Sequence, residues 1–147
     1  MALAKIVYAS LTGNTEEIAD IVAEALENLD IEVEQEECSQ VDASDFSDAD
    51  ICIIATYTYG DGELPDEIVD FYEELQEVDL KGKIYGVVGS GDTFYDLFCQ
   101  SVDDFEAAFE KTGATKGATA VKVDLAAEED DIVKLEAFAK EIAAKLG

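Results

Sequence analysis

The stretch "LAKIVYASLTGNTEEIADIV", residues 3–22, changes its hydrophobic period in the middle. Residues 3–9 are mostly apolar, as in a buried strand. After a short loop, apolar residues recur at the three- and four-residue spacing of a helix with one buried face. Asn14 can cap that helix, with Glu17 three residues further on. The stretch therefore predicts a strand, a tight loop and a helix in succession.

The same alternation continues along the chain. Further strands are expected at residues 31–36, 51–55, 83–91 and 119–125, while residues 38–49 fit a loop with one irregular turn around Phe46. Pro65 suits the first turn of the second helix, because the N–H that proline lacks has no partner there. The apolar faces expected for the four helices are Ile18, Ile21, Val22, Ala25, Leu26 and Leu29; Ile68, Phe71, Tyr72 and Leu75; Val102, Phe105 and Phe109; and Ile132, Leu135, Phe138, Ala139, Ile142 and Leu146.

Five strands interleaved with helices predict an α/β fold with a doubly wound parallel sheet, because parallel strands need crossovers and both faces need cover. The strand at residues 31–36 alternates apolar and acidic residues, which is typical of a sheet edge. Residues 51–55 are continuously apolar, which indicates a strand covered on both faces. With no linker or repeat, the 147 residues are expected to form one domain, 1–147.

The charge of the chain is one-sided. It has 36 acidic residues against 9 lysines, no arginine or histidine, and a formal net charge of −27. Nucleic acid and anionic membranes are poor partners for such a surface, because both attract cations. A basic protein partner is one explanation of the charge, and simple solubility is the other; composition leaves both open. Repulsion between two chains of such high negative charge favours a monomer.

The cysteines indicate neither a disulfide framework nor a metal site. There are three of them, Cys38, Cys52 and Cys99, and none forms a CxxC pair. The first residues contain one lysine and a strand-like segment rather than the long apolar region of a signal peptide. We therefore expect reduced thiols, no metal and a cytoplasmic protein.

Three loops of unusual composition follow strands: "SLTGNT" after the first, "TYTYGDGELP" after the third and "GSGDTFYD" after the fourth. Open α/β sheets bind ligands at the carboxyl edge where strand order reverses, which for the order 2-1-3-4-5 brings these loops together. In the first loop, hydroxyl and amide side chains, a glycine and a helix start can bind a phosphate without a cationic side chain. The same residues can instead serve only to form a turn and to cap the helix that follows.

Aromatic residues occupy the other two loops. Tyr57, Tyr59, Phe94 and Tyr95 are poor choices at loop tips unless something flat covers them. A planar ring between these loops, with its phosphate tail in the first loop, would occupy all three. Each tyrosine taken singly can equally be a half-packed surface aromatic.

Three segments resemble the FMN-contacting segments of flavodoxins, in particular short-chain flavodoxins of low-GC Gram-positive bacteria. The resemblance covers essentially the whole chain and implies the three-layer fold with strand order 2-1-3-4-5 and bound FMN. The three segments are Ser10, Leu11, Thr12, Gly13, Asn14 and Thr15; Thr56, Tyr57, Thr58, Tyr59, Gly60 and Asp61; and Gly91, Asp92, Thr93, Phe94, Tyr95 and Asp96.

The resemblance also implies a role for each segment. The first loop would hold the FMN phosphate, and Thr56 and Thr58 would lie near the ribityl and phosphate groups. Tyr59 would stack on the inner side of the flavin, where some relatives have Trp, and Tyr95 on the outer side. The remaining roles would be a peptide flip at Gly60 toward flavin N5, a contact of the Asp92 amide with the pyrimidine edge, and a place near the third loop for Cys99, without chemistry.

These features predict a one-electron carrier without a substrate of its own. Acidic residues crowd the site, so an anionic reduced flavin is disfavoured and a neutral semiquinone is expected to accumulate. Basic reductases or iron–sulfur oxidoreductases are the expected partners. The alternatives are a flavin-dependent NAD(P)H:quinone reductase on the same fold and a phospho-receiver module. The receiver would need acids after the first and third strands, where this chain has Ser10 and Thr56.

Overall fold

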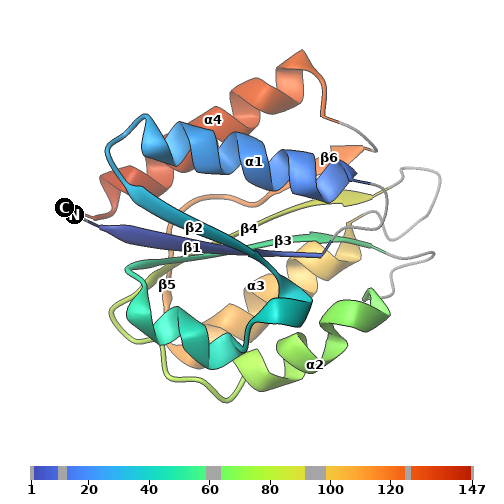
Figure 1. Cartoon of the computed structure of the whole chain (residues 1–147), viewed down its shortest axis with the longest axis vertical. Helices are drawn as coiled ribbons and strands as arrows, with labels where there is room; N and C mark the ends of the chain where they lie inside the picture. Colours follow the sequence, from blue (N-terminus) through green and yellow to red (C-terminus); the bar gives the residue numbers. More distant parts are fainter. Residues whose placement is uncertain (1, 10–12, 59–63, 92–98, 125–126, 147) are drawn as a thin grey trace.

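The computed structural model describes residues 2–9, 13–58, 64–91, 99–124 and 127–146 of the chain, and the statements below concern these residues. Strands and helices alternate along most of the sequence (Figure 1). The elements are β1 (Leu3–Tyr8), α1 (Asn14–Glu27), β2 (Glu32–Glu37), the 3-10 segments η1 (Cys38–Gln40) and η2 (Ala43–Asp48), β3 (Ile51–Tyr57), α2 (Asp66–Leu75), β4 (Ile84–Gly91), α3 (Gln100–Thr112), β5 (Thr115–Lys116), β6 (Val121–Asp124) and α4 (Glu129–Ala144).

All strand pairs of the sheet are parallel, and the path β2-β1-β3-β4 is followed by two short strands that both pair with β4. The predicted order 2-1-3-4-5 and the predicted edge position of β2 are confirmed. The single last strand expected at residues 119–125 is wrong in one respect: β5 pairs with the start of β4 and β6 with its end. Gly117 lies between them, where a Cβ would approach Ile84 Cγ2 to 2.5 Å.

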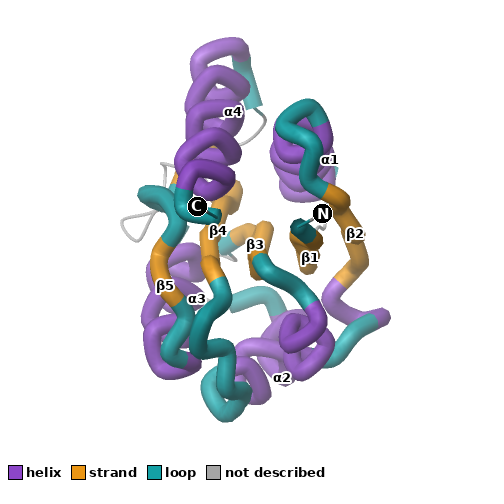
Figure 2. The backbone as a smooth tube through the Cα atoms, turned by 90° about the vertical axis from the view of Figure 1, so that its left-hand side faces the viewer, coloured by secondary structure: helices purple, strands orange, loops and turns teal. Residues whose placement is uncertain are grey.

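The helices cover both faces of the sheet, α1 and α4 on one and α2 and α3 on the other (Figures 1 and 2). Alternate residues of β3 serve the two sides: Ile51 and Ile53 pack in the α1/α4 core, and Cys52 and Ile54 in the α2/α3 core. Every residue from Ile51 to Thr56 is buried, so the expectation of a strand covered on both faces is confirmed.

Aromatic rings distinguish the α2/α3 core. Phe46, supplied by η2, lies 5.7 Å from Phe71 and 5.8 Å from Phe109 between ring centroids, and Phe109 stacks on Tyr85 at 4.8 Å. Such ring pairs add about 0.5–1.5 kcal/mol each beyond the area they bury. The expected loop with one turn is in fact two 3-10 segments, and the second of them buries Phe46 in this core.

Helix ends differ from the expectations in detail. Gly13 and Pro65, rather than residues inside the helices, are the N-caps of α1 and α2, and Asn14 is not a cap. Leu29 and Leu146 follow the last turns of α1 and α4 and are 37% and 36% exposed, so they do not belong to the inner faces. None of the helices in the described part has the length and apolar character needed to cross a membrane.

Candidate functional site

The carboxyl ends of β1, β3 and β4 lie side by side in the sheet, because β3 pairs with both of its neighbours in parallel. The loops chosen from the sequence therefore start at one edge. Of the candidate residues, the structure describes Gly13, Asn14, Thr15, Thr56, Tyr57, Thr58, Gly91 and Cys99. The other candidates lie outside the described residues: Ser10, Leu11, Thr12, Tyr59, Gly60, Asp61, Asp92, Phe94 and Tyr95.

The first loop enters α1 through Gly13, which has a φ of +91°. No heavy atom lies within 4 Å of where its Cβ would be, so the backbone conformation rather than space favours glycine here. The carbonyl of Gly13 accepts the N–H of Glu17 at 3.0 Å, which closes the first helical turn. The helix thus directs its positive dipole end and its first N–H groups toward the edge where the loops start.

Thr15 anchors this helix start to the sheet. Its side chain is 1% exposed, and its Oγ1 lies 3.0 Å from Oγ of Ser90 on β4. The carbonyl of Ser90 in turn accepts the N–H of Thr58 at 3.1 Å. Ser90 therefore joins the first loop to the second, a role that the sequence analysis missed although Ser90 lies within the quoted "GSGDTFYD" segment.

The second loop leaves β3 through Thr56, Tyr57 and Thr58. Thr56 is completely buried, and its hydroxyl donates to the Tyr57 carbonyl at 3.2 Å. The Tyr57 ring belongs to the α2/α3 side, where its hydroxyl donates to Glu67 Oε1 at 3.3 Å. Burial and the nearby Glu67 carboxylate raise the pKa of Tyr57 to about 12. The Tyr57 ring is therefore held against α2 by its hydrogen bond to Glu67.

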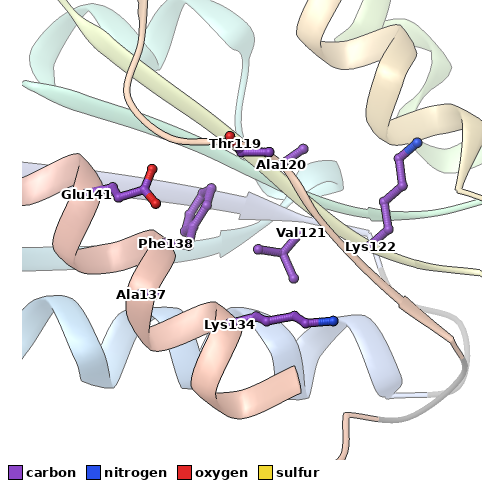
Figure 3. Close-up of a pocket in the computed structure, with 8 residues that line it drawn as sticks. All are labelled: Thr119, Ala120, Val121, Lys122, Lys134, Ala137, Phe138 and Glu141. Carbon is purple, nitrogen blue, oxygen red and sulfur yellow. The ribbon is translucent and has the colours of Figure 1, made fainter. Parts of the chain in front are cut away.

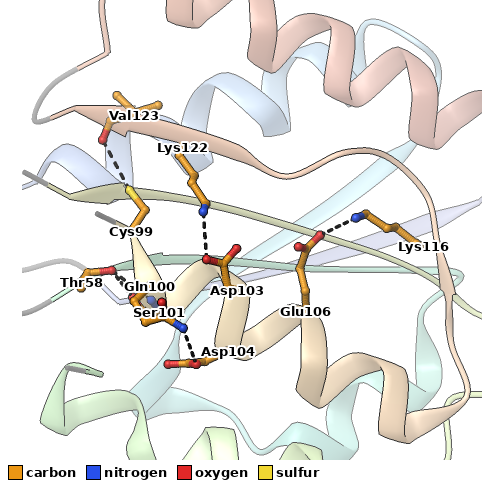
Figure 4. Close-up of polar contacts among 10 residues, drawn as sticks. All are labelled: Thr58, Cys99, Gln100, Ser101, Asp103, Asp104, Glu106, Lys116, Lys122 and Val123. Atoms are coloured by element: carbon orange, nitrogen blue, oxygen red, sulfur yellow. Dashed lines mark hydrogen bonds and ion pairs between the residues drawn. The ribbon is translucent and has the colours of Figure 1, made fainter. Parts of the chain in front are cut away.

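Thr58 is held by the start of α3. Its Oγ1 accepts the N–H of Ser101 at 3.1 Å and lies 2.7 Å from Oγ of Ser101 (Figure 4). Ser101 also donates its hydroxyl to the Tyr57 carbonyl at 2.7 Å. Ser101 was not predicted from the sequence, because a serine near a helix start more commonly serves its own helix.

The two ends of the third loop touch each other. A Cβ on Gly91 would lie 2.9 Å from Sγ of Cys99, so this close approach requires glycine. Cys99 has a φ of +54° and directs its thiol to the Val123 carbonyl at 3.9 Å (Figure 4). Burial raises the pKa of the Cys99 thiol to about 12, so the thiol stays protonated and unreactive at neutral pH.

Buried hydroxyls gather at this edge. Among the described residues, five polar side chains are buried, and four of them, Thr15, Thr56, Ser90 and Ser101, lie where β3 and β4 end and α1 and α3 begin. Buried hydroxyls lower stability unless they are hydrogen-bonded, and each of these has a partner within 3.2 Å. The edge is therefore a fixed polar frame for the loops.

A cavity of about 330 Å³ lies elsewhere, between β6 and α4 (Figure 3). Val121 and Phe138 line it together with Lys122 and Lys134, and it contains none of the candidate residues. The described part of the chain contains no group of three or more His, Cys, Asp or Glu side chains arranged to hold a metal ion.

Comparison with known proteins gives likenesses along the whole chain. Residues 6–146 match the family model described as Flavodoxin. "Probable flavodoxin 2" of Bacillus subtilis is 40% identical over 148 aligned positions, covering 100% of this chain and 98% of the relative. A solved flavodoxin of Streptococcus pneumoniae TIGR4 is 69% identical with a TM-score of 0.96, covering 98% of this chain and 99% of the other. A short-chain flavodoxin associated with a non-canonical PDU bacterial microcompartment is 49% identical with a TM-score of 0.98, covering 100% of both chains.

Proposed function

Because the chain belongs to the flavodoxin family, we propose that it binds FMN at the carboxyl edge of its sheet and carries single electrons between redox proteins. Flavodoxins are FMN flavoproteins of electron transport, and the flavin supplies the redox chemistry when bound. Membership excludes the phospho-receiver alternative. The task of this chain's own residues is to hold the cofactor and to set the charge around it.

The buried hydroxyl frame is the observation that supports the proposal, because it holds together, at one edge of the sheet, the places where the three loops begin. Thr15, Ser90 and Thr58 connect the first loop to the second through contacts of 3.0 and 3.1 Å. The start of α1 offers backbone N–H groups and a positive dipole end, which suit a phosphate. No lysine or arginine lies between Lys5 and Lys81, so the phosphate would be bound by N–H and hydroxyl groups.

The residue assignments remain part of the proposal. The phosphate would lie at the first loop, with Ser10, Thr12, Asn14 and the amides around Gly13 as its donors. Tyr59 and Tyr95 would flank the flavin, and Thr56, Gly60, Asp61, Gly91, Asp92 and Phe94 would complete the other two loops. Thr15 would also contribute to the phosphate site, and its contact with Ser90 at 3.0 Å holds the helix start in place.

The charge of the chain is uneven, which supports a basic redox partner. Residues 1–80 contain 23 acidic side chains and one lysine, whereas residues 81–147 contain 13 acidic side chains and eight lysines. The acidic part includes the first turns of α1 and α2, where Glu16, Glu17, Asp66 and Glu67 lie near the loop edge. A negative field there steers cationic proteins toward the cofactor and opposes a second negative charge on it.

An anaerobic reductive titration of the FMN-loaded protein tests this function. The proposal predicts a long-wavelength absorption of a neutral semiquinone before full bleaching, because the acidic surroundings disfavour the anionic reduced flavin. Bleaching in one two-electron step, with NAD(P)H consumed in the presence of a quinone, would instead establish a quinone reductase. Failure to retain FMN after desalting would remove the proposed function altogether.

A further inference from the structure

One side chain on α3 holds the end of the second loop. Ser101 is the second residue of α3, and it is completely buried. Two of its hydrogen bonds reach Thr58, 43 residues away: its N–H donates to Thr58 Oγ1 at 3.1 Å, and its Oγ lies 2.7 Å from Thr58 Oγ1 (Figure 4). A third reaches 44 residues away, where its Oγ donates to the Tyr57 carbonyl at 2.7 Å. None of these bonds serves its own helix.

The direction of these bonds follows from counting protons. A hydroxyl has one proton to donate, and a carbonyl can only accept. The proton of Ser101 Oγ must therefore go to the Tyr57 carbonyl, which leaves Ser101 as the acceptor in its bond with Thr58. Thr58 then donates its own proton to Ser101 while it accepts the Ser101 N–H. The hydroxyl proton of Thr58 is fully committed inside the protein.

We propose that Ser101 is a positioning residue for FMN, and that Thr58 acts in binding through Ser101 rather than by donating its hydroxyl to the phosphate. The strand β3 ends at Tyr57, and the N–H of Thr58 makes one more bond to Ser90. At the exit of β3, Ser101 fixes both the last carbonyl of the strand and the side chain that follows. Residues 59–61, which belong to the proposed flavin site, come directly after Thr58 in the chain.

The other end of α3 provides a matched control. Thr112 is 3% exposed, donates its hydroxyl to the Phe109 carbonyl and accepts the Ala114 N–H at 3.2 Å. It is thus a buried hydroxyl of the same helix with the same kinds of partner. It lies at the opposite end of α3 from the candidate site. Loss of its hydroxyl should affect stability without affecting FMN.

The test compares Ser101→Ala with Thr112→Ala in the full chain. For each FMN-loaded protein, the Kd for FMN is measured by following flavin fluorescence on dilution, and the free energy of unfolding is measured in urea. We expect both variants to unfold at lower urea than the parent chain. Only Ser101→Ala should raise the Kd, by about tenfold, which corresponds to ~1.4 kcal/mol at 25 °C.

Thr58 supplies a second pair of variants that does not depend on Ser101→Ala folding. Thr58→Val keeps the shape and removes the hydroxyl, and Thr58→Ser keeps the hydroxyl. We expect Thr58→Val to bind FMN about tenfold more weakly than Thr58→Ser. Equal Kd values within this pair, or equal Kd values for Ser101→Ala and Thr112→Ala, would overturn the inference.

This inference rests on the proposed function, and the same titrations separate the two. If the parent chain itself fails to bind FMN, the proposed function is wrong. If the parent chain binds FMN and the variants bind it equally well, the function stands and Ser101 has only a structural role.

Discussion

The carboxyl edge of the sheet and its middle are built from different side chains of the same two strands. In β3, the apolar run Ile51–Ala55 ends in Thr56, and in β4 the apolar Val87 and Val88 precede Ser90. All of these residues are buried. The middle stabilises the fold by burying apolar area, whereas the hydroxyls at the edge add little net stability but fix directions in space. One end of a continuous core is thus specialised for holding loops.

The largest effect should come from removing the ring at the centre of the aromatic core. Phe46→Ala leaves a cavity between Phe71 and Phe109, and such truncations lower the free energy of unfolding by about 3–5 kcal/mol. Denaturant unfolding measures the loss, with the milder Phe46→Leu as control. If the middle only stabilises, the fraction that remains folded should bind FMN with the parent Kd. A large rise in that Kd would show that the middle of the sheet affects FMN binding as well as stability.

A smaller effect is expected where the two regions meet. A Cβ at Gly89 would lie 2.4 Å from the Thr56 carbonyl oxygen and 2.6 Å from Val102 Cγ2. Overpacking of this kind lowers stability by about 1–3 kcal/mol. Because Thr56 belongs to the edge, Gly89→Ala should weaken FMN binding as well.

Gly82→Ala is the control for Gly89→Ala. Gly82 has a φ of +86° and nothing within 4 Å of a Cβ, so that variant carries only backbone strain, about 1–2 kcal/mol. Calorimetry and FMN titration should show a stability loss in both variants but weaker binding only in Gly89→Ala. If the Gly89→Ala protein were less stable but bound FMN with the parent Kd, the close packing of β3 against β4 would not affect the site.

Alkaline pH should weaken both regions through their tyrosines. Burial raises the pKa of Tyr85, in the middle, and of Tyr57, at the edge, from 10.0 to about 12. A pKa raised by folding gives stability that is fully present below pH 10 and is lost as pH rises toward 12. Urea unfolding between pH 8 and 12 should therefore show a decline starting near pH 10.

Tyr85→Phe and Tyr57→Phe should each make that decline shallower. The control is the same pair of variants at pH 8, where both tyrosines are neutral and their titration contributes nothing. An unchanged pH profile in both variants would show that other groups cause the alkaline loss.

The smallest effect is expected outside both regions. Lys122 Nζ lies 2.9 Å from Asp103 Oδ2, but both side chains are partly exposed. Such surface ion pairs contribute about 0–1 kcal/mol and weaken with salt. Lys122→Gln should change the unfolding midpoint only slightly at low salt and not at all at high salt. A larger loss would show that the ion pair between β6 and α3 contributes substantially to stability.

The sequence predicts the middle of the sheet better than its edge. Continuous apolar runs located β3 and β4 to within two residues, since burial on both faces leaves a strong pattern. The two-residue strand β5 is exposed and carries no apolar signal, so it was missed. Asn14 was expected as the cap of α1, but the positive φ of Gly13 places the helix start one residue earlier.

The hydroxyl frame depends on contacts that no local pattern contains. Ser90 lies 75 residues from Thr15, and Ser101 lies 43 residues from Thr58. A serine near a turn or a helix start has many ordinary uses, so its partner becomes visible only in three dimensions. The loops, with Thr15 and Thr56, could be chosen from their composition, whereas Ser90 and Ser101, which hold them, could not.

The most direct test of the account is an FMN titration of the isotope-labelled protein followed by amide NMR. The account predicts shifts concentrated at the carboxyl edge, at the amides of Gly13, Thr15, Thr58, Gly91 and Ser101. Amides in the aromatic core and around the β6/α4 cavity, such as those of Phe46 and Phe138, should stay near their starting positions. Shifts centred on Phe138 and its neighbours with an unchanged carboxyl edge would contradict the account.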